Sequence, residues 1–254
     1  MSGPALPDLY TRDYRTAFSA LRRLLSDGED TTQVFRIMRA LNGSSTPKGY
    51  DKLVKRPGGG RIAYARVELA ERFSDPALVA SFAPDSVGAA YRAWLERTGY
   101  SAQGLAEISN LDKVALVQHP YAWFGRRTRD VHDVWHVLTG YRADETMGEA
   151  CLVAFSYAQT GGLGWAWIAA GAALKSIRVT GNRLFARAVW EGYRHGKAAA
   201  WLLGEEYETL LHEPLDAARA RLGIREPVAY KHAQAVLGEA MASYATQRKV
   251  AAAA

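Results

Sequence analysis

Two histidines four residues apart are the residues of this chain with the clearest chemistry. His132 and His136 flank Asp133, and Glu149 follows after twelve intervening residues. On a helix, side chains at the histidine spacing lie on one face with Cβ atoms about 5–6 Å apart. Two imidazoles with a carboxylate from Glu149 or Asp133 suit zinc, and equally ferrous iron or manganese. Because Cys151 is the single cysteine, the pattern predicts an open catalytic or ligand-binding metal site rather than a structural staple.

The same residues also have less specific interpretations. A His-x-x-x-His pair arises often by chance on helices and usually marks surface or core imidazoles. Asp133 lies one position off the histidine face and fits either solvation or the orienting of a histidine. Thr146 and Glu149 also match a capping box for the next helix. A metalloprotease would need glutamate where Asp133 stands, so the shorter aspartate argues against peptide hydrolysis.

A longer pattern surrounds the histidines. The segment from Arg129 to Gly140, with Gly148 and Glu149, resembles the signature of the ubiquinone (coenzyme Q) biosynthesis family of the Coq-four type. That signature reads His-Asp-x-x-His, eleven residues, then Glu. This chain has twelve residues there, and loops absorb insertions more easily than helices. The extra residue is therefore expected in the turn at 141–145, where Glu145 competes with Glu149 for the carboxylate role.

The resemblance is strongest over residues 70–224, because several further elements follow the family's order. These elements are Pro84–Tyr91, Trp94-Leu95, Gln159–Gly161, Gly196-Lys197, Glu205-Glu206, Pro214-Leu215, Arg219 and Leu222–Ile224.

The resemblance implies an enzyme of ubiquinone biosynthesis. It implies metal-dependent oxidative decarboxylation of a polyprenylated aromatic intermediate, in which the ring loses its carboxyl group and gains a hydroxyl at the same carbon. The metal ligands would be His132, His136 and Glu149, with Asp133 as a further candidate. Asp133 and Glu149 would also take part in catalysis. Zinc is the expected metal. Iron is the alternative, because an oxidation would use the redox chemistry that iron has and zinc lacks.

Two further residues are candidates for substrate binding. Arg129 matches the family arginine and fits bidentate pairing with a ring carboxylate. A salt bridge to a nearby acid explains Arg129 equally well. Trp167 lies in the uncharged stretch 150–174, which is long enough to span a bilayer, yet Gly161 and Gly162 in its middle predict a turn between two buried helices. The resemblance implies that this apolar surface contacts a prenyl tail.

Other functions stay open. One alternative is a non-catalytic organiser that binds the prenyl lipid and gathers other ubiquinone-biosynthesis proteins, with a structural metal. A metal-dependent phosphohydrolase would need a further histidine and aspartate, and His119 and Asp216 lack a supporting context. The net charge of +6 and pI near 9.4 favour a membrane surface as partner. Nucleic acid is not expected, because no zinc finger, RNA-recognition motif or basic block is present. A homo-oligomer is compatible with the sequence.

Hydrophobic periodicity predicts an all-α fold, with residues 1–254 as a single helical domain. The metal site is expected between the His-bearing helix and the start of the next helix. The glycine-rich segment 42–61 predicts a loop or hairpin tip. Helices are expected at 12–25, 31–41, 66–73, 75–82, 86–98, 101–109, 112–117, 129–139, 146–160, 163–180, 182–201 and 205–222.

The cysteine content and the first residues bear on the compartment. One cysteine excludes an internal disulfide and suits a reducing environment. Residues 1–10 show neither a secretory apolar core nor the pattern of a transit peptide. The expected location is therefore the bacterial cytoplasm, peripheral on the inner face of the cytoplasmic membrane.

Overall fold

The computed structural model describes residues 11–26, 30–101, 104 and 119–239. Within these ranges the regular elements are all helices, which confirms the predicted all-α class, and a single isolated β-bridge joins Ser86 to Pro214. The helices are α1 (Tyr14–Ser26), α2 (Thr31–Leu41), α3 (Ser45–Val54), α4 (Gly59–Ala65), α5 (Leu69–Phe73), α6 (Pro76–Ala80), α7 (Val87–Thr98), α9 (Pro120–Asp130), α10 (His132–Thr139), α11 (Thr146–Thr160), α12 (Leu163–Thr180), α13 (Leu184–Ala198), the 3-10 turn η2 (Leu202–Gly204), α14 (Tyr207–Leu210) and α15 (Leu215–Leu222). A further helix covers 228–239.

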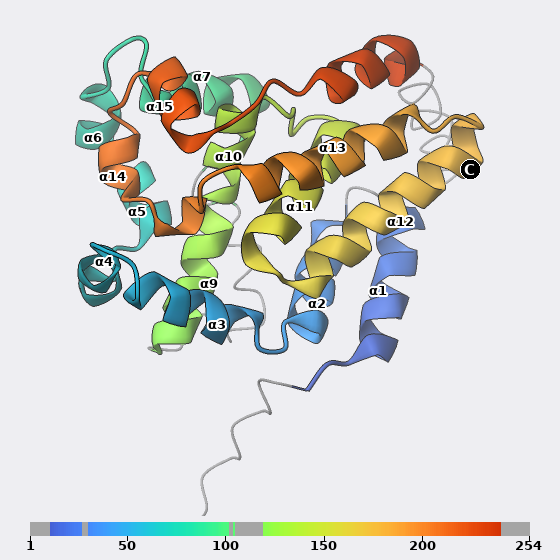
Figure 1. Ribbon diagram of the computed structural model, residues 1–254, viewed down its shortest axis with the longest axis horizontal. Coiled ribbons are helices and arrows are strands. Elements are labelled where there is room, and N and C mark those ends of the chain that lie inside the picture. The colour runs from blue at the N-terminus through green and yellow to red at the C-terminus, as the bar shows by residue number, and fades with distance from the viewer. Residues whose placement is uncertain (1–10, 27–29, 102–103, 105–118, 240–254) are drawn as a thin grey trace, which may run out of the picture.

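Helix α11 is the central element of the fold. It packs against α10, α12 and α13, and in Figure 1 it runs between them. Its residues from Ala150 to Ser156 are all buried, as expected for a helix that is apolar on every side. The chain ends α11 at Gly161, which has a φ of +70°, and begins α12 at Leu163. This confirms the turn predicted inside 150–174. Among the described residues, no helix has the length and apolar character needed to cross a membrane.

Two glycines bring α13 into backbone contact with α11. A Cβ atom added at Gly192 would lie 2.4 Å from the carbonyl oxygen of Cys151, and one added at Gly196 would lie 2.5 Å from that of Phe155. Both glycines lie on one face of α13, four residues apart. Since neither has a side chain, the two helices approach until their backbones touch. This contact fixes the placement of α11, which carries Glu149.

The prediction of a loop over 42–61 was wrong, because α3 and the start of α4 lie there. The Asn42 side chain accepts hydrogen bonds from the first turn of α3. Gly58 has a φ of +74°, and a Cβ at Gly59 would lie 1.8 Å from the carbonyl oxygen of Leu53. The glycines thus let the chain fold back closely over the end of α3 and start another helix. This tertiary contact overrides their usual meaning as loop residues.

Other predicted boundaries also moved. The expected helix 129–139 is two helices, because α9 ends at Asp130 and α10 begins at His132. The expected helix 205–222 is broken into α14 and α15. There the backbone pairs with the start of α7 instead: the N–H of Val87 donates to the Glu213 carbonyl at 2.9 Å. The predicted helices 101–109 and 112–117 fall almost wholly outside the described residues.

Candidate metal centre

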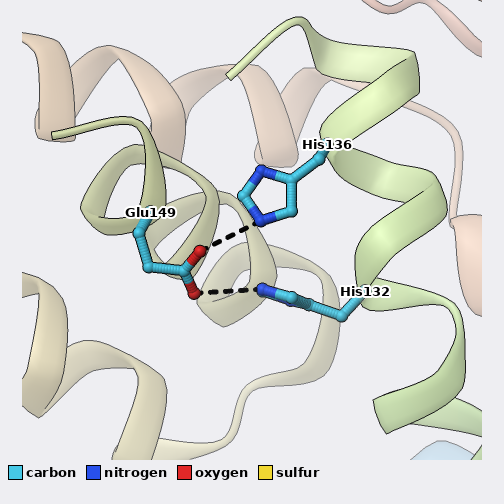
Figure 2. A group of neighbouring side chains, drawn as sticks. All are labelled: His132, His136 and Glu149. Carbon is cyan, nitrogen blue, oxygen red and sulfur yellow. Dashed lines mark hydrogen bonds and ion pairs between the residues drawn. The ribbon is translucent and has the colours of Figure 1, made fainter. Parts of the chain in front are cut away.

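Three side chains from α10 and the first turn of α11 converge on one point. His132 Nε2 lies 3.2 Å from Glu149 Oε1, and His136 Nε2 lies 3.0 Å from Glu149 Oε2 (Figure 2). One donor atom from each residue lies within 4.8 Å of the others, and no other such group occurs among the described residues. Ligands about 2.0–2.1 Å from a tetrahedral zinc ion are themselves about 3.3 Å apart. The donor types and their spacing therefore fit a zinc or ferrous iron site with an open position.

The backbone around the turn between α10 and α11 places these donors. Helix α10 ends at Gly140, which has a φ of +75° and donates its N–H to the His136 carbonyl at 2.9 Å. On the α11 side of this turn, Gly148 lies in close contact with the backbone of the turn. A Cβ at Gly148 would lie 2.1 Å from the Arg142 carbonyl oxygen. Only glycine lets the first turn of α11 come this close to the connecting turn, and that approach brings Glu149 to the histidines.

His136 is anchored on the ring nitrogen that faces away from Glu149. Its Nδ1 donates to the backbone oxygen of Tyr141 at 2.8 Å, which leaves the Nε2 lone pair directed at the candidate metal position. The ring is buried and stacks on Trp94, with centroids 5.9 Å apart. His136 is therefore held in both tautomer and orientation.

His132 is held differently. Its ring stacks on Trp165 at 5.4 Å with an interplanar angle of 16°. Its Nδ1 is buried and has no hydrogen-bond partner among the described residues. The sequence analysis named Trp167 rather than Trp165 for substrate binding. Trp167 instead packs against Tyr14 of α1, with ring centroids 6.0 Å apart. Two positions along a helix differ by about 200°, so the two indoles point to different sides of α12, and periodicity alone does not say which one reaches the site.

Glu149 and the two imidazoles stabilise each other's charged forms, which shifts the pKa values of Glu149 and His136. Burial would raise the pKa of the Glu149 carboxyl, but hydrogen bonds and charge from the two imidazoles outweigh it and hold that pKa well below its usual range. Burial alone would lower the pKa of His136, but Glu149 and then Asp133 reverse the effect and raise it. For Asp133, burial raises the pKa to about 6 despite the neighbouring histidines.

The remaining acidic candidates do not join the donor group. Asp133 is not among the three converging residues. Glu145 accepts hydrogen bonds from the Tyr230 hydroxyl and from Gln234 Nε2, away from the histidines. The capping-box interpretation was wrong, because Glu145 is the N-cap residue of α11, Thr146 is its first residue, and no side chain caps the helix.

A cavity of about 520 Å³ opens onto His132 and Glu149. Most of its wall comes from α2, α3, α9 and α12. Arg129 lines it too, and the Arg129 Nε atom donates to Asp130 Oδ1 at 2.7 Å. The salt-bridge interpretation of Arg129 therefore holds, while its position on the cavity wall leaves substrate contact open. The larger apolar side chains of the lining are Val34, Phe35, Met38, Phe124, Trp165, Trp201 and Leu203.

Residues 15–228 match the model of a family described as Coenzyme Q (ubiquinone) biosynthesis protein Coq4. The chain belongs to the Coq4 family. A ubiquinone biosynthesis protein of Pyrenophora tritici-repentis is 29% identical over 209 residues, which cover 80% of this chain and 65% of the relative. The corresponding protein of Phaeosphaeria nodorum is 29% identical over 182 residues, which cover 70% and 59%. The chain thus spans somewhat less than two thirds of these relatives.

The fold has a counterpart among solved structures. A crystal structure from Nostoc punctiforme PCC 73102, of a protein provisionally named for ubiquinone biosynthesis, superposes with a TM-score of 0.61. The alignment covers 85% of this Coq4 chain and 100% of that chain, at 20% sequence identity. At that identity the match supports a shared helical fold.

The expectation of a bacterial cytoplasmic location was wrong. Both fungal relatives, and a third from Arthroderma otae, are named mitochondrial proteins. That expectation rested on the composition of residues 1–10, and ten residues of ordinary composition are weak grounds for assigning a compartment.

Proposed function

We propose that this Coq4 protein is a metal-dependent enzyme of ubiquinone biosynthesis that catalyses oxidative decarboxylation of a polyprenylated aromatic intermediate. The observation that carries the proposal is the convergence of His132, His136 and Glu149 on the wall of a large, mainly apolar cavity. Ligand pockets of this kind combine an apolar wall with a few polar groups that fix orientation. Family membership supplies the pathway.

The proposed reaction replaces one ring substituent. The bond between the ring carbon and its carboxyl carbon breaks, carbon dioxide leaves, and a new carbon–oxygen bond forms at the same ring carbon. The change requires an oxidant that supplies the oxygen atom: either a peroxide, or dioxygen together with a two-electron reductant that converts the second oxygen atom to water. With a peroxide, the remaining products are a phenol and water, so that atoms and electrons balance.

The chain's own residues would divide the work as follows. His132, His136 and Glu149 would hold the metal, zinc by preference or iron. When bound, such an ion polarises a ring oxygen as a Lewis acid, and iron would also offer redox chemistry. Asp133, with its pKa near 6, suits a group that accepts and returns a proton near neutral pH. Arg129 would bind the ring carboxylate by exchanging part of its pairing with Asp130.

The apolar walls of the cavity favour the prenyl tail as the remainder of the ligand. Burying a hydrocarbon chain contributes about 0.8 kcal/mol per methylene group, so a long tail supplies most of the binding free energy. Trp167 would act outside the cavity. Its ring contacts Tyr14 of α1, and Phe18 one helical turn further along α1 is exposed. Aromatic side chains of this kind suit a membrane surface. Other ubiquinone-biosynthesis proteins are proposed partners through the pathway.

The test is metal analysis followed by turnover of a carboxylated, prenylated phenol. We expect about one divalent ion per chain and a product that has lost its carboxyl group and gained a hydroxyl. A matched prenylated phenol without the carboxyl group is the control and should be unchanged. A lipid-binding organiser predicts binding of both compounds without turnover, and that result with metal-loaded protein and the oxidant present would contradict the enzyme proposal.

A further inference from the structure

A second cavity reaches the metal centre from His136. It has a volume of about 460 Å³ and shares no lining residue with the first cavity. Its walls come from α7, from the end of α10 and the turn that follows, and from α15. The centre thus contacts two separate cavities, one through His132 and Glu149 and the other through His136.

The charge of the second cavity is entirely positive among the residues that line it. Arg97, Arg142 and Arg219 all contribute to its wall, and no carboxylate does. Arg142 pairs with Asp144, and Arg219 lies 3.5 Å from Asp216, but neither aspartate lines the cavity. The Arg97 side chain is exposed. Three guanidinium groups therefore surround one cavity. Arg142 and Arg219 already use their Nε and Nη2 donors, so Arg97 presents the planar, fork-shaped donors that match an oxyanion.

The carbonyl end of α10 forms part of the cavity wall and would repel an anion, but Arg219 neutralises it. The carbonyl end of α10 carries partial negative charge. Arg219 donates to the carbonyl oxygens of Leu138 at 2.9 Å and Val137 at 3.1 Å. These carbonyl groups are therefore satisfied by a cation, which removes the main source of negative potential at this end of the cavity.

Trp94 provides a second and independent observation. It lines the cavity and is 4% exposed, yet its indole Nε1 is buried and has no hydrogen-bond partner within the part of the chain that the structure describes. An indole nitrogen can only donate, and a buried donor without an acceptor is costly. An acceptor supplied from outside the chain would satisfy it, and an oxyanion is such an acceptor.

We propose that this cavity is an oxyanion-binding site for a small carboxylate, bicarbonate or phosphate. Arg97 and Arg142 hold the anion, and Trp94 donates a further hydrogen bond. The site borders the candidate metal centre through His136, but the groups proposed to hold the anion, Arg97, Arg142 and Trp94, are not members of the donor group. It gives a hydrophilic anion its own access to the side of the centre that the apolar cavity does not reach.

The experiment is isothermal titration of the full chain with bicarbonate, benzoate and inorganic phosphate, each at constant ionic strength. Saturable binding of at least one anion is expected, and the strongest of the three identifies the source of the oxyanion. Arg97→Gln should weaken that binding about tenfold, the scale of one lost hydrogen bond to a charged group. Trp94→Phe, which keeps an aromatic ring and removes the donor, should weaken it by a similar factor.

Two controls keep the result specific. Arg187→Gln removes the same charge from the exposed surface of α13 and should leave binding unchanged. His132→Ala should abolish anion binding to any metal ion in the centre but leave binding to the arginine cavity intact, so this inference and the proposed function can fail separately. No saturable binding of any anion would overturn the proposal. Equal losses in Arg97→Gln and Arg187→Gln, or complete loss in His132→Ala, would overturn it too.

Discussion

The two histidines of the candidate metal centre occupy unlike surroundings. His136 is 3% exposed, donates through Nδ1 to the Tyr141 carbonyl and stacks on Trp94. His132 is 8% exposed, stacks on Trp165 and leaves its Nδ1 without a partner. Both imidazoles contact Glu149 through Nε2, but among the described residues only His136 is also held by a hydrogen bond at Nδ1, whereas the outer side of His132 is held by ring packing.

This difference separates a fixed ligand from an adjustable one. A hydrogen bond to the outer nitrogen sets both the tautomer and the ring angle of a metal-binding histidine. Stacking at 5.4 Å limits the tilt of the His132 ring but does not select a tautomer. His136 therefore fixes the position of the candidate metal site. His132 lines the apolar cavity and is free to adjust its position when a ligand enters that cavity.

The largest expected effect comes from removing either imidazole. His132→Ala and His136→Ala should each weaken metal binding by more than about 100-fold, which is the upper scale for loss of a mere supporting contact. Stability should respond unequally. His136→Ala leaves a buried carbonyl unpaired and should lower the free energy of unfolding by a further 1–3 kcal/mol, roughly. Metal titration and denaturant unfolding of metal-free protein measure the two quantities.

The difference in unfolding free energy between the two variants tests the proposed difference between the two histidines. If both variants lose equal stability, the Tyr141 hydrogen bond contributes nothing that packing does not. Unchanged metal content in both variants would remove the ligand assignment altogether. His195→Ala serves as a control, since His195 does not belong to the donor group.

The next effect concerns turnover at unchanged metal content. Asp133→Asn keeps the side-chain size and removes the proton-accepting carboxylate, so the proposed reaction should slow by about 10²-fold. Product analysis by mass spectrometry should show the carboxylated prenylated ring accumulating. Wild-type turnover by a folded, metal-loaded Asp133→Asn protein would rule out a catalytic role for Asp133.

A pH series tests whether His136, the fixed ligand, has the raised pKa that its contact with Glu149 implies. The pKa of His136 is raised above its ordinary 6.5 by Glu149. In metal-free protein this stabilisation is fully present below pH 6.5 and is lost as pH rises through the raised pKa. Metal affinity has the opposite sign and should increase with pH, by about tenfold per unit for each proton displaced. Unfolding free energy and metal affinity measured between pH 5 and pH 8, roughly, should therefore change in opposite directions.

Asp133 adds a second pH-dependent contribution to stability, which begins at lower pH. Its pKa is raised from 3.8 to about 6 by burial. The metal-free protein should therefore lose stability as pH rises from 3.8 through about 6. Asp133→Asn should abolish this part of the curve and keep the part of the His136 contribution that comes from Glu149. A curve that is the same in both proteins would show that the Asp133 carboxyl is not buried in solution.

The smallest effect tests the cavity wall beside the adjustable ligand. Arg129→Gln should weaken binding of a carboxylated prenylated phenol about tenfold, and Arg129→Lys should restore part of it because charge returns without the guanidinium fork. The matched phenol without a carboxyl group should bind all variants alike. Equal weakening for both ligands would assign Arg129 to a purely structural pair with Asp130.

The sequence predicts best those parts of the fold and of the candidate site that depend on contacts between residues close together in the chain. The spacing of His132 and His136 sets their shared face within one helix, and the turn before Glu149 is short, so the structure brings the predicted ligands together. The helices α11 and α12 were equally local, because Gly161 marks the turn between them. The loop predicted over 42–61 failed because Gly59 is required by contact with Leu53, which no glycine count reveals.

Features that depend on distant elements were not predictable. The choice between Trp165 and Trp167 depends on which side of α12 faces α10. The arginine cavity draws Arg97, Arg142 and Arg219 from three separate parts of the chain, and each alone resembles an ordinary surface cation. The role of Glu145 was similarly hidden, since its partner Tyr230 lies 85 residues away in a helix that the sequence did not predict.

The glycine contact between α13 and α11 has a consequence for inherited variation. Gly192 and Gly196 hold no ligand and line neither cavity, yet a single methyl group at either would meet a carbonyl oxygen of α11 at about 2.4–2.5 Å. The least costly relief is a shift of α11 away from α13, and Glu149 moves with it. A Gly→Ala change at these positions should thus act as a mutation of the candidate metal centre, although it lies on the far side of α11 and leaves His132, His136 and Glu149 unchanged.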